Sequence, residues 1–160
     1  MPDCEGTPEF TVDELLYRRL RSDWVGADGG VRVAGISGAQ SPVDLPRCSV
    51  DRESLAGGIA GVLSRAKPVE TAVAAVAVRD VPEDFTHEGS RVRYRSRVVY
   101  MPLDHNAAHS EIWVRHPDEA GTPTRKPGDA FKLKIRMEIA RRMTLVHPPP
   151  APAPPVRIIY

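Results

Sequence analysis

Hydrophobic and polar positions alternate most strictly at the start of residues 91–100. Arginine occupies every second position there, and the positions between are held by Val92, Tyr94, Ser96 and Val98. A β-strand places successive side chains on opposite faces. The spacing therefore predicts a half-exposed strand with one largely apolar face and one face of arginines.

Four further segments are predicted to be strands. Residues 71–78 form a continuous apolar run rich in valine, which is typical of a central strand covered on both faces. Residues 31–37 follow a glycine turn and alternate in polarity, and residues 48–50 form a short extended piece. Residues 110–114 follow the arginine-rich segment closely, which suggests antiparallel pairing of the two.

Three segments are predicted to be helical. Thr11 and Glu14 have the spacing of a capping box ahead of apolar residues, which favours a short helix through residues 11–20. Between residues 52 and 66, apolar side chains recur at spacings of three and four, although three glycines weaken the helix. Residues 129–144 fit either period; their length favours a helix, and the strand alternative stays open.

The chain is predicted to form one α+β domain over residues 11–147, with a mainly antiparallel or mixed sheet and two or three helices. Residues 1–10 lack periodicity and are expected to be a flexible leader. Residues 148–160 are predicted to be an extended Pro-rich C-terminal tail, in which a proline-rich spacer precedes an apolar tip.

Composition excludes several classes of protein. The chain has 160 residues, of which 41% are hydrophobic and 27% charged, as in ordinary globular domains. No run approaches the roughly 20 apolar residues of a membrane span, and residues 1–5 do not resemble a secretory signal. We therefore expect a cytoplasmic protein without membrane association. Cys4 and Cys48 lack the spacing of a disulfide framework or a metal site, so no cofactor or metal is expected.

Charge is distributed unevenly along a chain whose formal net charge is +1. Residues 1–90 contain nine basic and fifteen acidic side chains, whereas residues 91–147 contain twelve basic and six acidic side chains. This asymmetry either marks a face for an anionic partner or is neutralised by pairing within one fold.

The tail is the first candidate binding element. A polyproline II spacer of eight residues can extend about 25 Å, and a β-prone tip can pair with a sheet edge or enter a partner groove. Docking on its own domain, or a disordered end, is the alternative. The predicted partner-binding residues are Val156, Arg157, Ile158, Ile159 and Tyr160.

The arginine strand is the second candidate. Arg91, Arg93, Arg95 and Arg97 share one face of the predicted strand and can contact phosphate groups of a nucleic acid. The alternative is a solvated face, or one paired with acidic side chains. The sequence contains no glycine-flanked aromatic RNA-binding motif and no recognition-helix pattern.

A loop that contains His105 and His109 is the third candidate, because clustered imidazole and carboxylate groups can bind a divalent ion. In the alternative interpretation, Asn106 shapes a turn, and His109 and Glu111 lie on one face of a strand. Motifs such as GxSxG, the phosphate-binding loop and CxxC do not occur, so no catalytic residue is predicted.

Segments 16–20, 23–25, 48–52 and 106–112 together resemble a loose group of small uncharacterised bacterial proteins with no assigned activity. The likeness covers most of residues 15–115. It implies a compact α+β domain in which polar and aromatic positions gather at strand ends. They form either a pocket or partner surface, or an internal network of arginine and carboxylate groups that fixes loops. These positions are Trp24, Arg47, Asp51, Arg52, His109 and Glu111.

The sequence therefore predicts a non-catalytic accessory or adaptor protein that binds a protein partner through its C-terminal tail. The alternative is a nucleic-acid-associated protein that uses the arginine strand. The third hypothesis is a small metal-dependent enzyme built around His105, His109 and Glu111. The oligomeric state stays open.

Overall fold

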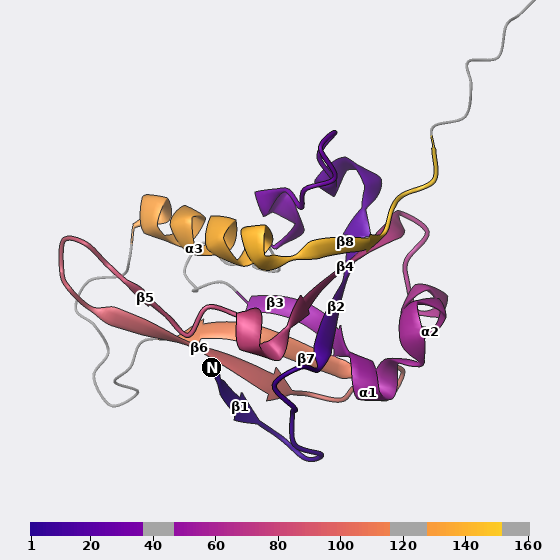
Figure 1. The fold of residues 1–160 in the computed structure, drawn as a ribbon, viewed down its shortest axis with the longest axis horizontal. Helices are drawn as coiled ribbons and strands as arrows, with labels where there is room; N and C mark the ends of the chain where they lie inside the picture. Colours follow the sequence, from indigo (N-terminus) through magenta and orange to yellow (C-terminus); the bar gives the residue numbers. More distant parts are fainter. Residues whose placement is uncertain (37–46, 116–127, 152–160) are drawn as a thin grey trace, which may run out of the picture.

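The computed structural model describes residues 1–36, 47–115 and 128–151. Within these residues, eight strands form one mixed sheet, accompanied by three α-helices and three short 3₁₀ helices (Figure 1). The strands are β1 (Asp3–Glu5), β2 (Leu15–Arg21), β3 (Arg47–Arg52), β4 (Glu70–Ala77), β5 (Asp84–Thr86), β6 (Arg93–Tyr100), β7 (His109–Arg115) and β8 (Thr144–His147). The helices are α1 (Glu53–Ala56), α2 (Gly58–Ser64), α3 (Asp129–Arg142), η1 (Ser22–Trp24), η2 (Val33–Gly35) and η3 (Val78–Asp80).

The strand order is β1-β6-β7-β3-β2-β4-β8, with β5 paired to β6 beside β1. Neighbouring strands are antiparallel except β1, which runs parallel to β6. The mixed sheet and three α-helices confirm the predicted α+β class. Residues 152–160 of the predicted tail lie outside the described residues.

Helix α3 covers one face of the sheet with side chains four residues apart. Phe131, Ile135 and Ile139 are buried, whereas Leu133 and Met137 are exposed. A strand would place all five side chains on one face, so the burial pattern confirms the helical interpretation for residues 129–142, and Thr144 already belongs to β8. Neither α3 nor any other helix in the described ranges is both long and apolar enough to cross a membrane.

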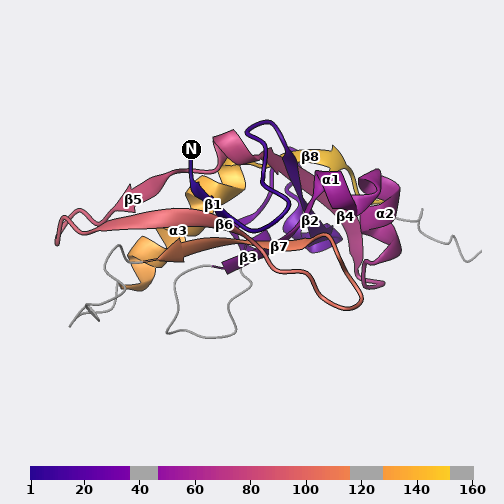
Figure 2. The same cartoon turned by 90° about the horizontal axis from the view of Figure 1, so that it is seen from below.

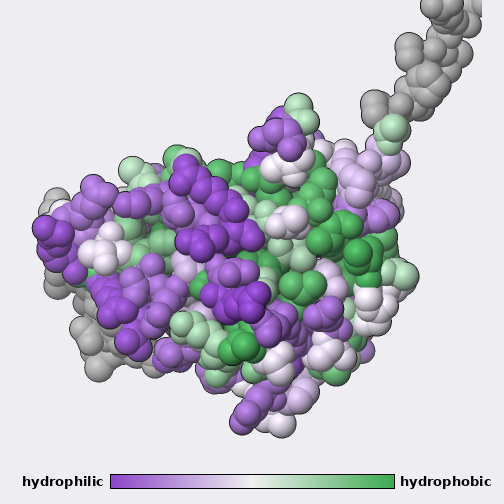
Figure 3. All heavy atoms as spheres, in the orientation of Figure 1, coloured by the Kyte–Doolittle hydropathy of each residue, from purple (hydrophilic) through white to green (hydrophobic). Residues whose placement is uncertain are grey.

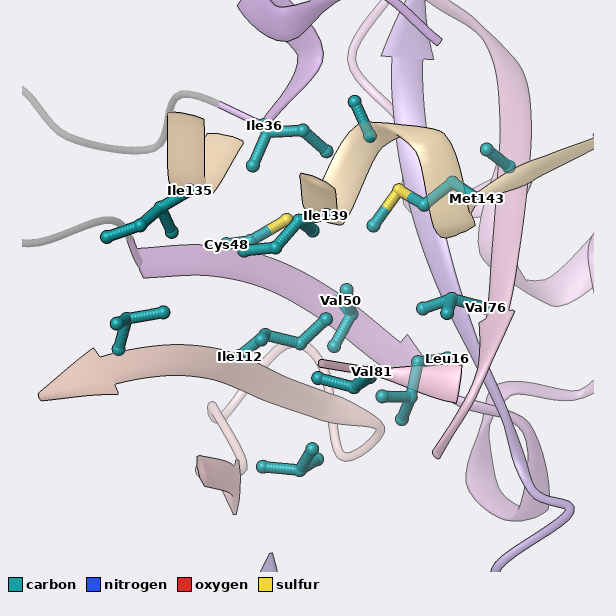
Figure 4. Packing of buried hydrophobic residues seen from close by; sticks show 14 of the residues in the cluster. Leu16, Ile36, Cys48, Val50, Val76, Val81, Ile112, Ile135, Ile139 and Met143 are labelled. Atoms are coloured by element: carbon teal, nitrogen blue, oxygen red, sulfur yellow. The ribbon is translucent and has the colours of Figure 1, made fainter. Parts of the chain in front are cut away.

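The main core lies between α3 and the sheet (Figure 4). Ile135, Ile139 and Met143 pack over Cys48 and Val50 of β3, all of them buried. Each fully buried aliphatic side chain contributes about 1.5–3 kcal/mol of hydrophobic stabilisation. This layer therefore fixes which face of β3 points inward.

A second, smaller core lies on the other face of the sheet. Helices α1 and α2 pack there over β2 and β4, at the end of the sheet away from β5 and β6 (Figure 2). The cluster includes Tyr17 of β2, Val73 and Ala75 of β4, and Ala56 and Val62 of the helices. These helices are short, so the coverage they give is confined to that end.

Most predicted elements are confirmed. Residues 48–50, 71–78, 91–100 and 110–114 lie in β3, β4, β6 and β7, and β6 pairs with β7 in antiparallel fashion. The predicted helix over residues 52–66 is divided into α1 and α2. The break falls at Gly57 and Gly58, whose φ angles of 72° and 68° are left-handed and end α1. Strand β4 is buried on both faces as predicted, but it lies next to the edge strand β8 rather than at the centre.

Three predictions are wrong. The helix expected within residues 11–20 is strand β2, because its two hydrogen-bonded neighbours β3 and β4 outweigh the local capping signal. Within the strand expected at residues 31–37, Val33–Gly35 form the short helix η2, and residue 37 lies outside the described residues. Residues 1–10 were expected to be a flexible leader, yet they contain β1, which pairs with β6. The short strand β8 has no counterpart among the expected elements.

We predict that Ile139→Ala lowers the free energy of unfolding by about 2–5 kcal/mol, because it leaves a cavity in a core that cannot fully collapse. Urea unfolding followed by circular dichroism measures this. Leu133→Ala is the matched control on the same helix; Leu133 is 46% exposed, so the change should stay within about 0.5 kcal/mol. Equal losses from the two variants would contradict the assignment of the buried stripe.

Candidate functional site

Strands β6, β7 and β3 carry a polar surface on the face opposite α3. The alternate residues of these strands fill the core, so the residues between them must point the other way. We call this surface the arginine face. Its members are Arg93, Arg95 and Arg97 of β6; His109, Glu111, Trp113 and Arg115 of β7; and Arg47, Ser49 and Asp51 of β3.

The strand register places basic side chains around one indole. Trp113 lies directly between Arg97 on β6 and Arg47 on β3, and Arg95 pairs with Arg115 in the adjoining row. Directly opposed side chains on neighbouring antiparallel strands have Cβ atoms about 5 Å apart. The guanidinium carbons of Arg115 and Arg47 lie 3.8 Å and 4.4 Å from the centroid of the Trp113 ring.

Glu111 holds this group together. Arg47 Nε donates a hydrogen bond to Glu111 Oε2 over 2.8 Å, and the Trp113 indole Nε1 donates to the same oxygen. Partial burial alone would raise the pKa of Glu111, but the hydrogen bonds from Trp113 and Arg47 and the nearby positive charges lower it overall. The carboxylate is therefore charged at neutral pH and fixes the orientation of the indole.

The arginines of β6 are paired with acidic side chains at the sheet edge. The pairs are Arg93 with Asp84 of β5, Arg95 with Asp3 of β1 at 3.7 Å, and Arg97 with Glu5 of β1 at 3.8 Å. Exposed ion pairs of this kind contribute at most about 1 kcal/mol. The fourth predicted residue, Arg91, lies in the turn before β6 with a positive φ of 60° and does not belong to the row.

Asp51 is a buried member of the arginine face and lies opposite His109 in the strand register. Asn106 Nδ2 donates a 2.7 Å hydrogen bond to Asp51 Oδ1. Asp51 Oδ2 has no hydrogen-bond partner, but it lies 3.6 Å from Arg65 Nη2 and 3.8 Å from Arg19 Nε. Through these contacts the buried carboxylate joins β2, β3 and the end of α2, so we assign Asp51 a structural role.

Arg52 points to the opposite side of β3 from Asp51 and forms a second buried network. Arg52 Nε and Nη2 donate hydrogen bonds of 2.9 Å and 2.8 Å to the two carboxylate oxygens of Glu14, and Ser54 Oγ donates to Glu14 over 2.6 Å. The carbonyl oxygens of Pro8 and Glu9 accept further hydrogen bonds from Arg52. This network fastens the segment after β1 to the end of β3.

The pKa of Glu14 reflects this environment. Burial alone would raise it, but the hydrogen bonds from Arg52 and Ser54 outweigh burial and hold the pKa below its ordinary value. An open hollow of about 630 Å³ lies beside the pair, and its lining includes the acidic residues Glu9, Asp13 and Glu53. The negative charge of this lining disfavours polyanions, whereas the positive charge of the arginine face attracts them.

The predicted pocket is therefore divided. Four of its six residues share the arginine face, namely Arg47, Asp51, His109 and Glu111. Arg52 belongs to the network on the other side of β3, and Trp24 lies in η1 with its ring 5.5 Å from the guanidinium carbon of Arg21. The set does not form one pocket.

The candidate metal ligands are also separated by burial. His105 is exposed in a turn, whereas His109 is buried on β7, with Nε2 3.6 Å from Glu111 Oε1. Across the three described ranges, no group of three or more His, Cys, Asp or Glu side chains is placed to hold a metal ion. The predicted partner-binding residues 156–160 lie outside the described part of the chain.

Sequence reasoning missed the aromatic and basic residues Trp113 and Arg115 of the arginine face. The signal was available, because residues 109–115 alternate between inward and outward positions and place both residues on the same face as Glu111. The position of Arg47 next to Trp113 could not be found in this way. It depends on the register between β3 and β7, which are far apart in the chain.

Comparison of the chain with protein-family models, with curated proteins and with solved structures gives no match. Function must therefore be inferred from the geometry and charge of the surface. A face that combines several guanidinium groups with an indole is chemically suited to a ligand with both negative charges and flat rings.

We predict that Glu14→Gln lowers the free energy of unfolding at pH 7 by about 3 kcal/mol, because it leaves the buried Arg52 charge uncompensated. The pKa of Glu14 is lower in the folded chain than in the unfolded chain. Its contribution is therefore complete above the unfolded pKa of about 4.3 and is lost as the pH falls through the folded pKa.

Chemical denaturation between pH 7 and pH 3 measures both effects, and the gap between wild type and Glu14→Gln should shrink toward acid pH. Glu9→Gln is the control, because Glu9 contacts Arg52 through its backbone carbonyl. A gap that is independent of pH would contradict a role for the Glu14 charge.

Proposed function

We propose that this is a non-catalytic binding protein whose arginine face binds nucleic acid. The observation that carries the proposal is the register of β6, β7 and β3, which gathers five arginines and one tryptophan on one side of three adjacent strands. Guanidinium groups bind phosphate oxygens through charge-assisted hydrogen bonds. Closely spaced arginines therefore suit a backbone that repeats phosphates along its length.

The ion pairs of Arg95 and Arg97 on β6 are weak enough for a phosphate group to replace their carboxylate partners. Asp3 and Glu5 are exposed, and their distances to Arg95 and Arg97 are 3.7 Å and 3.8 Å, which is long for charge-assisted hydrogen bonds. Exposed pairs contribute at most about 1 kcal/mol, and each phosphate contact also releases condensed counterions. A phosphate can therefore replace an edge carboxylate at little cost.

We predict that replacing Arg93, Arg95 and Arg97 together with glutamine weakens binding to single-stranded DNA and reduces its salt dependence. If all three arginines contact phosphates, the slope of log K against log salt should fall by about 2. Fluorescence anisotropy of a labelled oligonucleotide between low and moderate salt measures both quantities.

The matched control replaces Lys134, Arg141 and Arg142 with glutamine, which removes the same charge from α3 on the other side of the sheet. The surface around α3, β5 and β6 is hydrophilic over much of the side seen in Figure 3, so net charge alone must be separated from location. Equal weakening by the two triple variants would contradict a specific role for the arginine face.

A second candidate function is that of an adaptor that binds a protein through the C-terminal tail. The observation that favours it is the position of β8, which terminates the strand order beyond β4 and leads directly into the proline-rich segment. Among the described strands, only β4 pairs with β8, so its outer edge can accept an additional strand.

For the adaptor function, we predict that a chain ending at His147 loses a partner that the full-length chain retains. A nuclease-treated pull-down from the native host, analysed by mass spectrometry, measures this. The control keeps the proline spacer and replaces residues 156–160 with glycine and serine. A partner set that is unchanged by both alterations would eliminate the tail as a docking element.

A further inference from the structure

Trp113 occupies an unusual position on the arginine face. It lies in the middle of the described sheet face formed by β6, β7 and β3, and its side chain is only partly buried. Large aromatic rings at such positions usually pack into a core, yet the buried side of β7 is formed by Ile112 and Val114. Trp113 points outward and therefore belongs to neither hydrophobic cluster of the described residues.

The ring of Trp113 is held in place before any ligand arrives. Its indole nitrogen donates to Glu111, which also accepts a hydrogen bond from Arg47. The position of Arg47 is fixed by this bond, and Arg47 lies 4.4 Å from the ring centroid. A preorganised ring loses little conformational freedom when a flat ligand stacks on it.

We propose that Trp113 is a stacking position for an unpaired nucleobase, so that the ligand of the arginine face is single-stranded nucleic acid. This inference rests on the proposed nucleic-acid function and adds the class of ligand. In a duplex, each base is stacked between its neighbours inside the helix and offers no free ring face. Only a strand with unpaired bases can place a ring on an indole that lies within a sheet face.

Stacking requires a local exchange at Arg115. Its guanidinium carbon lies 3.8 Å from the ring centroid, so the base takes its place over the indole. A stacked base contributes more binding free energy than a cation–π contact at a partly exposed site. The guanidinium of Arg115 then turns toward the phosphate backbone, which lies on the same face.

The test uses the intrinsic fluorescence of the two tryptophans, Trp24 and Trp113. In a Trp24→Phe variant, all tryptophan emission comes from Trp113. Titration with a short oligothymidylate should quench this emission, because thymine stacks on the indole. A duplex of oligothymidylate with oligoadenylate, at the same salt concentration, should bind at least about tenfold more weakly and leave the emission nearly unchanged.

Affinity measurements on variants complete the test. Trp113→Ala should weaken binding of the single strand by about tenfold and leave binding of the duplex unchanged, and Trp113→Phe should restore most of the loss. Trp24→Ala is the control, since Trp24 lies in η1, beside Arg21 and outside the arginine face. Circular dichroism shows whether each variant is folded.

The outcomes separate the two proposals. Binding of single strand and duplex with equal affinity, with unchanged Trp113 emission, would overturn the stacking position and leave the arginine face as a phosphate-binding surface. Failure of the folded wild-type chain to bind either form at low salt would overturn both proposals. An equal effect of Trp113→Ala and Trp113→Phe would also overturn stacking, because phenylalanine retains a ring.

Discussion

Successive side chains of a β-strand point to opposite faces, and this alternation along β6, β7 and β3 determines both the core and the candidate binding surface. Cys48, Val50 and Ile112 lie on the α3 side of the sheet, because burying them there adds to the hydrophobic stabilisation of the main core. Arg47 and Trp113 are then obliged to face the other way. A register shift of one residue would exchange the two faces, so the packing of α3 also maintains the arginine face.

The charge asymmetry of the chain is partly resolved within the fold. Acidic residues from residues 1–90 pair with basic residues from residues 91–147, as in Asp84 with Arg93 and Glu88 with Lys134. These pairs are exposed and weak, whereas the Glu14–Arg52 pair, within the acidic residues 1–90, is buried and hydrogen-bonded. The fold thus combines a buried ion pair with a structural role and exposed ion pairs that contribute little stability.

Local alternation was sufficient to predict β6, whereas the pattern of α3 fits either a strand or a helix, and the length of the segment favoured the helix. Local periodicity failed for β2, where Glu14 has the spacing of a capping box but its carboxylate is bonded to Arg52 instead. It also failed for β1, a strand of three residues that exists only because β6 offers an edge. The arginine row was found from the sequence, whereas its junction with Arg47 depends on a long-range register that no local pattern contains.

In the proposed function, the ligand lies on the arginine face and not on the side of the sheet that α3 covers. Two-dimensional NMR of ¹⁵N-labelled protein, titrated with a short single-stranded oligonucleotide, tests it most directly through the indole and arginine Nε signals. We expect large shifts for the Trp113 indole and for the arginines of β6 and β7, with the Trp24 indole unchanged. Shifts confined to residues of α3, or equal shifts of both indoles, would contradict it.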